Sequence, residues 1–207
     1  MSTLPDGLVL RTARPADLEQ ICELLVDRGE AGDDIDLRSV VEDPDAGWDW
    51  CGVVVDGEKV VATASLLEET VRIGSVTLPS GQVELVATHE DYEGRGLSRA
   101  LMGWAHERSA ARGHLLQVMI GIPYFYRLFG YEYAIDIPPA RELVDLPEPL
   151  AVGVDSDSPY YFASPEEGDI PELAALQGAA QDPYDVAVAH PEARWRWLMK
   201  TPGSELR

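Results

Sequence analysis

The sequence has little cysteine and histidine and no long hydrophobic run. Its two cysteines are too few for a disulfide framework, and its four histidines are scattered rather than set at a zinc-ligand spacing. No apolar run approaches the roughly 20 residues of a membrane-spanning helix. The first residues, MSTLPDGLVLRTARP, lack the basic start and apolar core of a signal peptide. We therefore expect a cytoplasmic protein with no metal and no membrane contact.

Positive charge is also scarce. There are 16 Lys and Arg against 37 Asp and Glu, which gives a formal net charge of −21. Such a surface repels phosphates, so we expect no nucleic-acid partner. An acidic surface mostly keeps a protein soluble, and it is also compatible with steering a cationic substrate into a cleft.

Hydrophobic spacing and turn residues predict a mixed α/β (α+β) domain in residues 1–150. Helical spacing covers 16–29 and, more weakly, 33–43, while Asp56-Gly57 is a strong hairpin signal. The other predicted elements are a strand over 8–15, turns at Gly74 and at 79–81, a strand over 83–88, a helix over 98–113, a strand over 114–122, a short aromatic helix that ends at Gly130, and a strand after it. This order predicts a mixed sheet with helices on its faces.

After residue 150 the pattern of the first segment returns weakly. Asp169 stands 152 residues after Asp17, and apolar residues recur at the same offset. Residues 151–207 are therefore interpreted as the start of a second, similar domain. The alternative is a C-terminal helical extension that packs on the first domain. Apolar surface in this part is compatible with a homo-oligomer.

Two glycines, Gly94 and Gly96, lie between a predicted strand and a predicted helix. The first N–H groups of a helix have no intrahelical partners, and the helix dipole adds partial positive charge there. Glycine removes the side chain that would hold a phosphate away. Residues 94–99 are therefore a candidate anion site, with Arg95 and Arg99 as added charge, although Gly-Arg-Gly is often only a turn. The chain has neither a GxxxxGK[ST] loop nor a GxGxxG fingerprint.

The string VATHEDYEGRGLSRALM, followed by an apolar strand and then by PYFYRLFGYEYA, resembles the GCN5-related N-acetyltransferase (GNAT) family. The resemblance covers about residues 8–137. It implies a mixed, mostly antiparallel sheet flanked by helices, with a splayed central strand pair. The aromatic string and the apparent second domain look most like the tandem-GNAT branch, which includes the Eis-type aminoglycoside acetyltransferases.

The resemblance also implies a site for acetyl-CoA. The end of the central strand would bind the pantetheine arm and the thioester carbonyl, and the glycine loop would bind the pyrophosphate. The residues at these positions are Val86, Ala87, Thr88, Gly94, Arg95, Gly96, Leu97, Ser98, Arg99, Gly121 and Ile122. Tyr126 occupies the position of the family's general acid, which would protonate the leaving thiolate. From spacing alone, Tyr126 and its aromatic neighbours could equally form a core cluster.

The general base stays open at this point. Glu84 lies two residues before Val86, and strand alternation would place both side chains on one face. His89, at the junction of strand and loop, has a suitable pKa. In the Eis-type branch the C-terminal carboxylate of a longer protein is thought to take this part.

One residue departs from the family's pattern. Near the glycines the family usually carries Arg or Gln, whereas this sequence has Glu93, or Asp91 in another register. A carboxylate beside a pyrophosphate weakens binding unless it turns to solvent or pairs with Arg95 or Arg99.

The resemblance implies an N-acetyltransferase that transfers the acetyl group of acetyl-CoA to a primary amine of a small acceptor, by direct attack in a ternary complex. The acidic charge hints at a cationic acceptor such as a polyamine or an aminoglycoside, with amino acids and protein N-termini still open. The alternative is a catalytically degenerate GNAT-like module that binds a CoA ester or mediates assembly without turnover. Glu93 favours the alternative, and Gly94, Gly96 and Tyr126 favour the enzyme.

Overall fold

The computed structural model describes residues 2–29, 32–122, 124–134 and 165–200, and within them seven strands form one sheet. The strands follow the order β1 to β6, and β7 pairs with β4. Their bounds are β1 (Ser2–Thr3), β2 (Val9–Thr12), β3 (Cys51–Asp56), β4 (Lys59–Ile73), β5 (Val76–Thr88), β6 (Leu116–Val118) and β7 (Val186–Val188). All pairings are antiparallel except that of β5 with β6.

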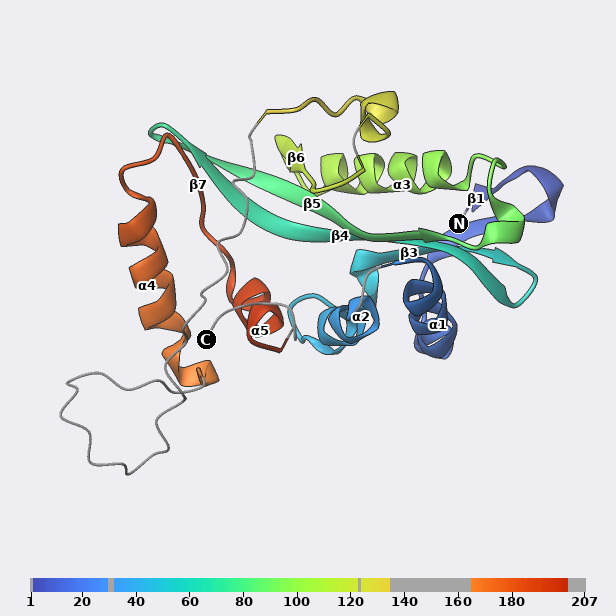
Figure 1. Cartoon of the computed structure of the whole chain (residues 1–207), viewed down its shortest axis with the longest axis horizontal. Coiled ribbons are helices and arrows are strands. Elements are labelled where there is room, and N and C mark those ends of the chain that lie inside the picture. Colours follow the sequence, from blue (N-terminus) through green and yellow to red (C-terminus); the bar gives the residue numbers. More distant parts are fainter. Residues whose placement is uncertain (1, 30–31, 123, 135–164, 201–207) are drawn as a thin grey trace, which may run out of the picture.

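Helices cover both faces of this sheet (Figure 1). The α-helices are α1 (Leu18–Arg28), α2 (Asp33–Glu42), α3 (Leu97–Ala111), α4 (Ile170–Gln181) and α5 (Glu192–Lys200). α3 packs on one face, while α1, α2 and α5 lie on the other. Short 3-10 helices are η1 (Pro5–Gly7), η2 (Pro15–Asp17), η3 (Trp48–Trp50), η4 (Glu90–Tyr92), η5 (Tyr126–Phe129) and η6 (Glu167–Asp169). No helix in these residues is both long and apolar enough to cross a membrane.

The strand pair β5–β6, at one end of the described strand order, is splayed. The two strands pair only where Ser80–Gln82 meets Leu116–Val118. Beyond Gln82, β5 has no partner strand on that side among the described residues. The predicted fold class, a mixed and mostly antiparallel sheet flanked by helices, is confirmed.

A β-bulge interrupts β5 just after the splay begins. Ser65 of β4 pairs with Glu84, and Thr63 pairs with Ala87, so Leu85 and Val86 together face one residue of β4. Leu85 has φ of 53°, a left-handed conformation that is uncommon for a residue with a side chain. The extra residue reverses the alternation of side chains along β5 from this point on.

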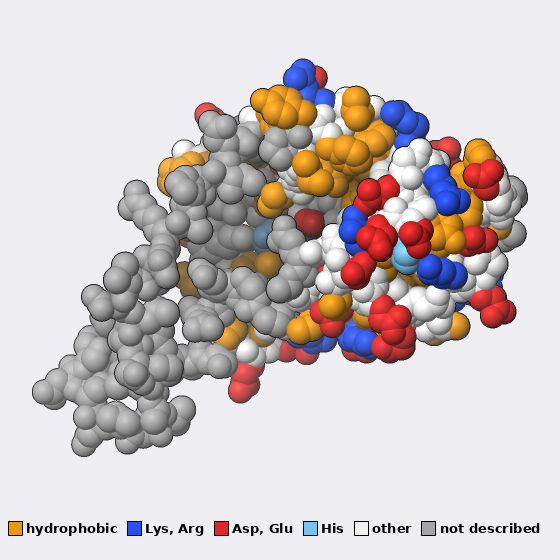
Figure 2. All heavy atoms as spheres, turned by 45° about the vertical axis from the view of Figure 1, so that its right-hand side comes forward, with side chains coloured by type: hydrophobic (Ala, Val, Ile, Leu, Met, Phe, Trp, Pro, Cys, Tyr) orange, Lys and Arg blue, Asp and Glu red, His pale blue; other side chains and the backbone are white. Residues whose placement is uncertain are grey.

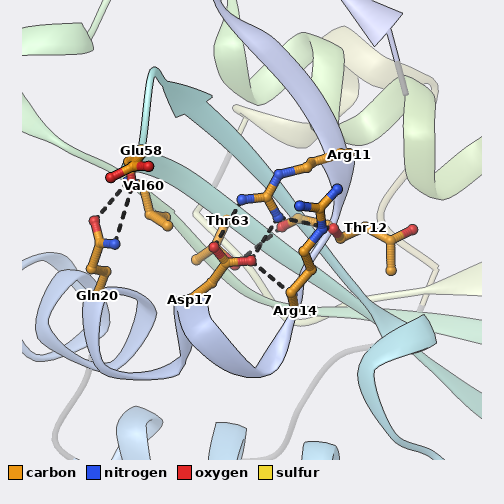
Figure 3. A network of polar contacts seen from close by, with 9 residues as sticks. Arg11, Thr12, Arg14, Asp17, Gln20, Glu58, Val60 and Thr63 are labelled. Atoms are coloured by element: carbon orange, nitrogen blue, oxygen red, sulfur yellow. Dashed lines mark hydrogen bonds and ion pairs between the residues drawn. The ribbon is translucent and has the colours of Figure 1, made fainter.

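Figure 3 shows how α1 is fixed to the sheet. Arg11 of β2 donates two hydrogen bonds to the Asp17 carboxylate, at 2.6 and 2.8 Å, and the same carboxylate accepts the Arg14 N–H at 2.7 Å. One turn later, Gln20 accepts the Val60 N–H at 3.0 Å. These bonds hold the start of α1 against β2 and β4, so that its apolar side packs into the core.

The C-terminal segment packs against the first domain. β7 pairs with Val71–Ile73, beyond the part of β4 that pairs with β3, and α5 lies beside α2 (Figure 1). At its start η6 and α4 repeat the geometry of η2 and α1: the Glu166 N–H donates to Asp169 at 2.9 Å, as the Arg14 N–H does to Asp17. The second domain in 151–207 stays a prediction, since residues 135–164 and 201–207 lie outside the described part.

Several predicted boundaries were wrong. No turn forms at 79–81, because Pro79 pairs with Thr70 in a continuous β5 and Gly81 lets His114 and Leu66 approach closely. The strand expected over 114–122 is reduced to β6. Residues 131–134 form no strand, and the rest of that predicted strand lies outside the described residues.

Candidate active site

The glycine loop and the start of α3 form an open concave backbone. Gly94 and Gly96 have φ of 73° and 78°, and a Cβ on either would meet nothing within 4 Å. The first helical hydrogen bond of α3 runs from the Ala100 N–H to the Gly96 carbonyl, so the N–H groups of residues 97–99 point beyond the helix. The backbone therefore has the form that an anion such as a pyrophosphate requires.

The charged side chains of this loop are held by neighbours. Arg95 donates to the Asp91 carbonyl at 2.9 Å and lies over the Tyr92 ring. Glu93 does not pair with either loop arginine; it forms an ion pair with Arg28 at the end of α1. This partner partly neutralises the carboxylate whose position departs from the family's pattern.

Arg99 connects α3 with η5, because its guanidinium lies 5.1 Å from the centre of the Phe129 ring. Leu97, the first residue of α3, buries its side chain in the core between the helix and the sheet, so only its backbone lies at the loop.

The end of β5 lies beside this helix start. The Thr88 hydroxyl is 3.5 Å from the Ser98 hydroxyl. Since the His89 N–H donates to Val61 of β4, and successive N–H groups of a strand point to opposite sides, the Thr88 N–H points away from β4 into the splay. Val86 packs under α3, and Ala87 is buried on the opposite face.

Tyr126 lies near the point where β5 and β6 separate, on the face of the sheet that α3 covers. Its ring lies against the backbone of Gly121, where any Cβ would be 2.6 Å or less from ring carbons. Phe125 and Tyr131 contact the ring edge to face, at 5.0 and 6.3 Å between centroids. Burial raises the pKa of Tyr126, and the charge of Glu84 raises it further. The Tyr126 hydroxyl therefore keeps its proton at neutral pH.

Glu84 lies on the opposite face from Val86, which corrects the prediction made from strand alternation. The bulge at Leu85 reverses the pattern, so that Val86 packs with α3 while Glu84 faces α2 and α5. Burial raises the pKa of Glu84, and Arg194 and a hydrogen bond from Gln82 oppose the rise. A partly buried carboxyl whose pKa is raised toward neutral has the property that a general base needs.

His89 is occupied elsewhere. Its Nδ1 accepts the Asp91 N–H at 3.3 Å, and its Nε2 lies 3.0 Å from Lys59 Nζ. The ring therefore caps η4 at the outer end of the sheet, and Glu84 is the better candidate for a base.

Figure 2 shows apolar side chains gathered at the top of the molecule, with acidic and basic side chains intermixed further down. The exposed apolar side chains around η5 are Ile120, Ile122, Tyr124, Leu128 and Tyr133. Ile122 thus lies on the surface beside the site rather than inside it. No group of three or more His, Cys, Asp or Glu suited to a metal occurs in the part of the chain that the structure describes.

Two polar residues of the site were not anticipated from the sequence. Gln82 hydrogen-bonds Glu84, and Arg194 of α5 reaches Gln82 at 3.3 Å. Glutamine two residues before a glutamate in a strand gave a usable signal, because the two share a face. Arg194 gave none, since it lies 112 residues away in sequence.

Comparison with known families decides the identity of the domain. The sequence model for the acetyltransferase (GNAT) domain matches residues 10–134. The chain belongs to the GNAT acetyltransferase family. Members of this family use acetyl-CoA, and the GNAT segment contains the glycine loop, Glu84 and Tyr126.

Several solved structures share this fold. A GCN5-related N-acetyltransferase from Kribbella flavida is 26% identical, with a TM-score of 0.51 over 60% of this chain and 33% of that chain. The Escherichia coli GNAT family N-acetyltransferase YhbS, solved in complex with CoA, is 24% identical, with a TM-score of 0.52 over 60% and 68%. A transcriptional regulator from Bacillus halodurans C-125 is 21% identical, with a TM-score of 0.53 over 65% and 99%.

This chain spans about a third of the Kribbella protein's length. A search of curated proteins found no match. The tandem, Eis-type assignment stays a prediction.

Proposed function

We propose that the protein is an N-acetyltransferase that transfers the acetyl group of acetyl-CoA to a primary amine of a small acceptor, by direct attack in a ternary complex. The observation that carries the proposal is the splay of β5 and β6. Glu84 faces it from the side of α2, Tyr126 from the side of α3, and the open glycine loop lies at its end.

The chain's residues fit acetyl-CoA. The N–H groups of residues 97–99 and the bare backbone at Gly94 and Gly96 suit the pyrophosphate, with Arg99 as nearby positive charge. The open edge of β5 from Val86 to Thr88 suits the amide groups of a pantetheine arm, which can pair like a short strand. When bound, acetyl-CoA supplies the activated acetyl group.

Each chemical task has a candidate group. Glu84 accepts a proton from the acceptor amine, directly or through water. The Thr88 N–H points into the splay, where it can donate to the oxygen of the reacting carbonyl as negative charge develops there. Tyr126, which like any tyrosine is protonated at neutral pH, gives a proton to the departing sulfur. Much of the rate would come from holding two substrates in one cleft.

A cationic acceptor suits the side from which Glu84 faces the splay. The carboxylates of Asp33 and Asp36 on α2 raise the pKa of Glu84 against the larger, opposing effect of Arg194. Together with Glu84 these carboxylates outnumber that cation on this side. A diamine, polyamine or aminoglycoside would be drawn there, whereas a carboxylate-bearing acceptor would be repelled.

Calorimetric titration of acetyl-CoA into the wild type and into Gly96→Glu tests the cofactor site. We expect micromolar binding to the wild type and none to the variant, because the added carboxylate would occupy the anion loop. Gly74→Glu is the matched control, since Gly74 also has a positive φ (58°) and open space but lies at the β4–β5 turn. No binding to the wild type would refute the proposal.

Release of CoA thiol in the presence of spermidine, kanamycin or lysine then tests turnover. Tyr126→Phe should lower kcat by roughly 100-fold, within the usual range for a general acid. Acetyl-CoA binding without turnover on any amine would favour the second candidate, a degenerate module that binds CoA esters or mediates assembly, for which Glu93 is the supporting feature.

A further inference from the structure

The helix α5 places a buried cation beneath the sheet. Arg194 is 9% exposed, and its Nε forms an ion pair with Glu69 of β4 at 2.9 Å. The Glu69 side chain is fully buried and also meets His190 Nδ1 at 2.9 Å. The Arg194 Cζ atom lies over the Trp197 ring, 3.6 Å from its centre. These contacts leave the guanidinium little freedom.

The same guanidinium reaches the candidate base through one intermediate side chain. Arg194 Nη2 donates to Gln82 Oε1 at 3.3 Å, and Gln82 Nε2 donates to Glu84 Oε1. A guanidinium only donates hydrogen bonds, so it selects the oxygen of the Gln82 amide. The amide NH₂ must then point along β5, toward the Glu84 carboxylate.

We infer that Arg194 is a positioning residue of the acetyltransferase site: acting through Gln82, it fixes the orientation and the ionisation of Glu84. The C-terminal segment is then part of the catalytic unit, although it lies outside the GNAT segment of residues 10–134. This inference rests on the proposed role of Glu84 as the base.

The charges around Glu84 favour this assignment. Asp33 and Asp36 of α2 repel its ionised form, and Tyr126 faces it across the splay. Burial adds to the penalty, so that Arg194 is the cation that the structure brings to this carboxylate. Burial lowers the pKa of Arg194 itself, but an arginine stays charged at neutral pH.

Removing the guanidinium would act in two ways. The Glu84 carboxylate would lose its nearby positive charge, so its pKa would rise. The Gln82 amide would be free to turn its oxygen toward Glu84, which also disfavours the ionised carboxylate. If the pKa of the base rises, the acid limb of the kcat/KM profile moves to higher pH as well. A purely structural defect instead lowers activity at all pH values.

Arg194→Met alone would leave the Glu69 carboxylate buried with only His190, and this could unfold the protein. The test therefore uses the double variant Glu69→Gln/Arg194→Met, which removes both charges together. Arg196→Gln is the matched control: Arg196 lies on the same helix and pairs with Asp43 at 2.6 Å, so its loss weakens the docking of α5 without touching Gln82.

Two readouts separate this inference from the proposed function. The first is the pKa of Glu84 from the pH titration of its side-chain carboxyl ¹³C signal, assigned with Glu84→Gln, which needs no turnover. The second is the pH profile of kcat/KM with the acceptor found by CoA-thiol release. We expect the double variant to raise the Glu84 pKa and to move the acid limb to higher pH, both by about one unit. At pH values below the acid limb, this shift is roughly a tenfold loss of kcat/KM.

Arg196→Gln should leave both values unchanged. Gln82→Met should lower kcat and shift the pKa less, since it keeps the guanidinium and removes the bridge. The inference is overturned if the double variant keeps the wild-type pKa of Glu84, or if Arg196→Gln moves it equally. Absence of turnover in the wild type would refute the proposed function and leave the NMR result to decide the Arg194–Glu84 linkage.

Discussion

A single methyl group at Gly121 should disturb Tyr126, the proposed general acid. Gly121 has no positive φ, so Gly121→Ala brings no backbone strain, but its Cβ would stand 2.6 Å from Tyr126 Cδ2 and closer still to Cε2. An ordinary contact is 3.4 Å or more, and the ring must therefore move by about 1 Å. A displacement of that size at a reacting group costs roughly 100-fold in rate, or about 2.7 kcal/mol.

The assay is steady-state release of CoA thiol, paired with calorimetry for acetyl-CoA. We expect kcat to fall roughly 100-fold while the Kd for acetyl-CoA stays within about threefold, because the added methyl meets the tyrosine and not the glycine loop. In the Tyr126→Phe background, Gly121→Ala should cause little further loss, since both act on one hydroxyl.

Gly103→Ala is the control for adding a methyl group. Gly103 is exposed on α3, and a Cβ there would meet nothing within 4 Å. The reasoning is refuted if Gly121→Ala turns over at the wild-type rate, or if it weakens acetyl-CoA binding and leaves kcat intact.

Two further predictions concern single charges. Asp17→Asn should lower the free energy of unfolding by about 3 kcal/mol at pH 7, because it leaves Arg11 largely buried without its counter-charge. Burial raises the pKa of Asp17, but hydrogen bonds from Arg11 and the Arg14 N–H outweigh it and hold the pKa below its usual value. The stabilisation is thus complete above about pH 3.9, the unfolded value. The stabilisation is lost as the pH falls through the lower folded pKa of Asp17. In urea denaturation, the unfolding free energies of wild type and variant should therefore converge at low pH, and a difference that stays constant with pH would contradict this prediction. Glu93→Gln should tighten acetyl-CoA binding roughly threefold at low ionic strength, and the gain should vanish in 0.5 M salt. Unchanged calorimetric affinity at low salt would show that Arg28 already neutralises Glu93.

The local elements of the fold were predictable where one segment carries its own signal. The apolar spacing of α1, the stop at Gly29 and the left-handed Gly130 that ends η5 were all evident in the sequence. The glycine loop was found in the same way, because Gly94 and Gly96 adopt the positive φ that glycine tolerates best.

Contacts between distant segments were not predictable. The bulge rests on Leu85, a residue type with no preference for positive φ, and it reversed the face on which Glu84 lies. Its cause is tertiary, since β5 must leave β6 after Gln82 while it stays paired with β4. The pairing of β7 with Val71–Ile73 joins residues more than 100 positions apart, and three-residue strands carry little pattern of their own.

The buried side chain of Glu69 sets how much of the chain a stably folded fragment must contain. The GNAT segment ends at residue 134, yet the two side chains that meet this carboxylate, Arg194 and His190, both come from the C-terminal segment. A fragment cut at residue 150 would keep every residue of the glycine loop but would leave the buried Glu69 carboxylate without either partner. Such a fragment would also expose the edge of β4 that pairs with β7, and an exposed strand edge can pair with another copy of the chain. The GNAT segment therefore ends some 60 residues before Arg194, which forms the ion pair with Glu69. A fragment that folds stably should extend far enough to include this ion pair.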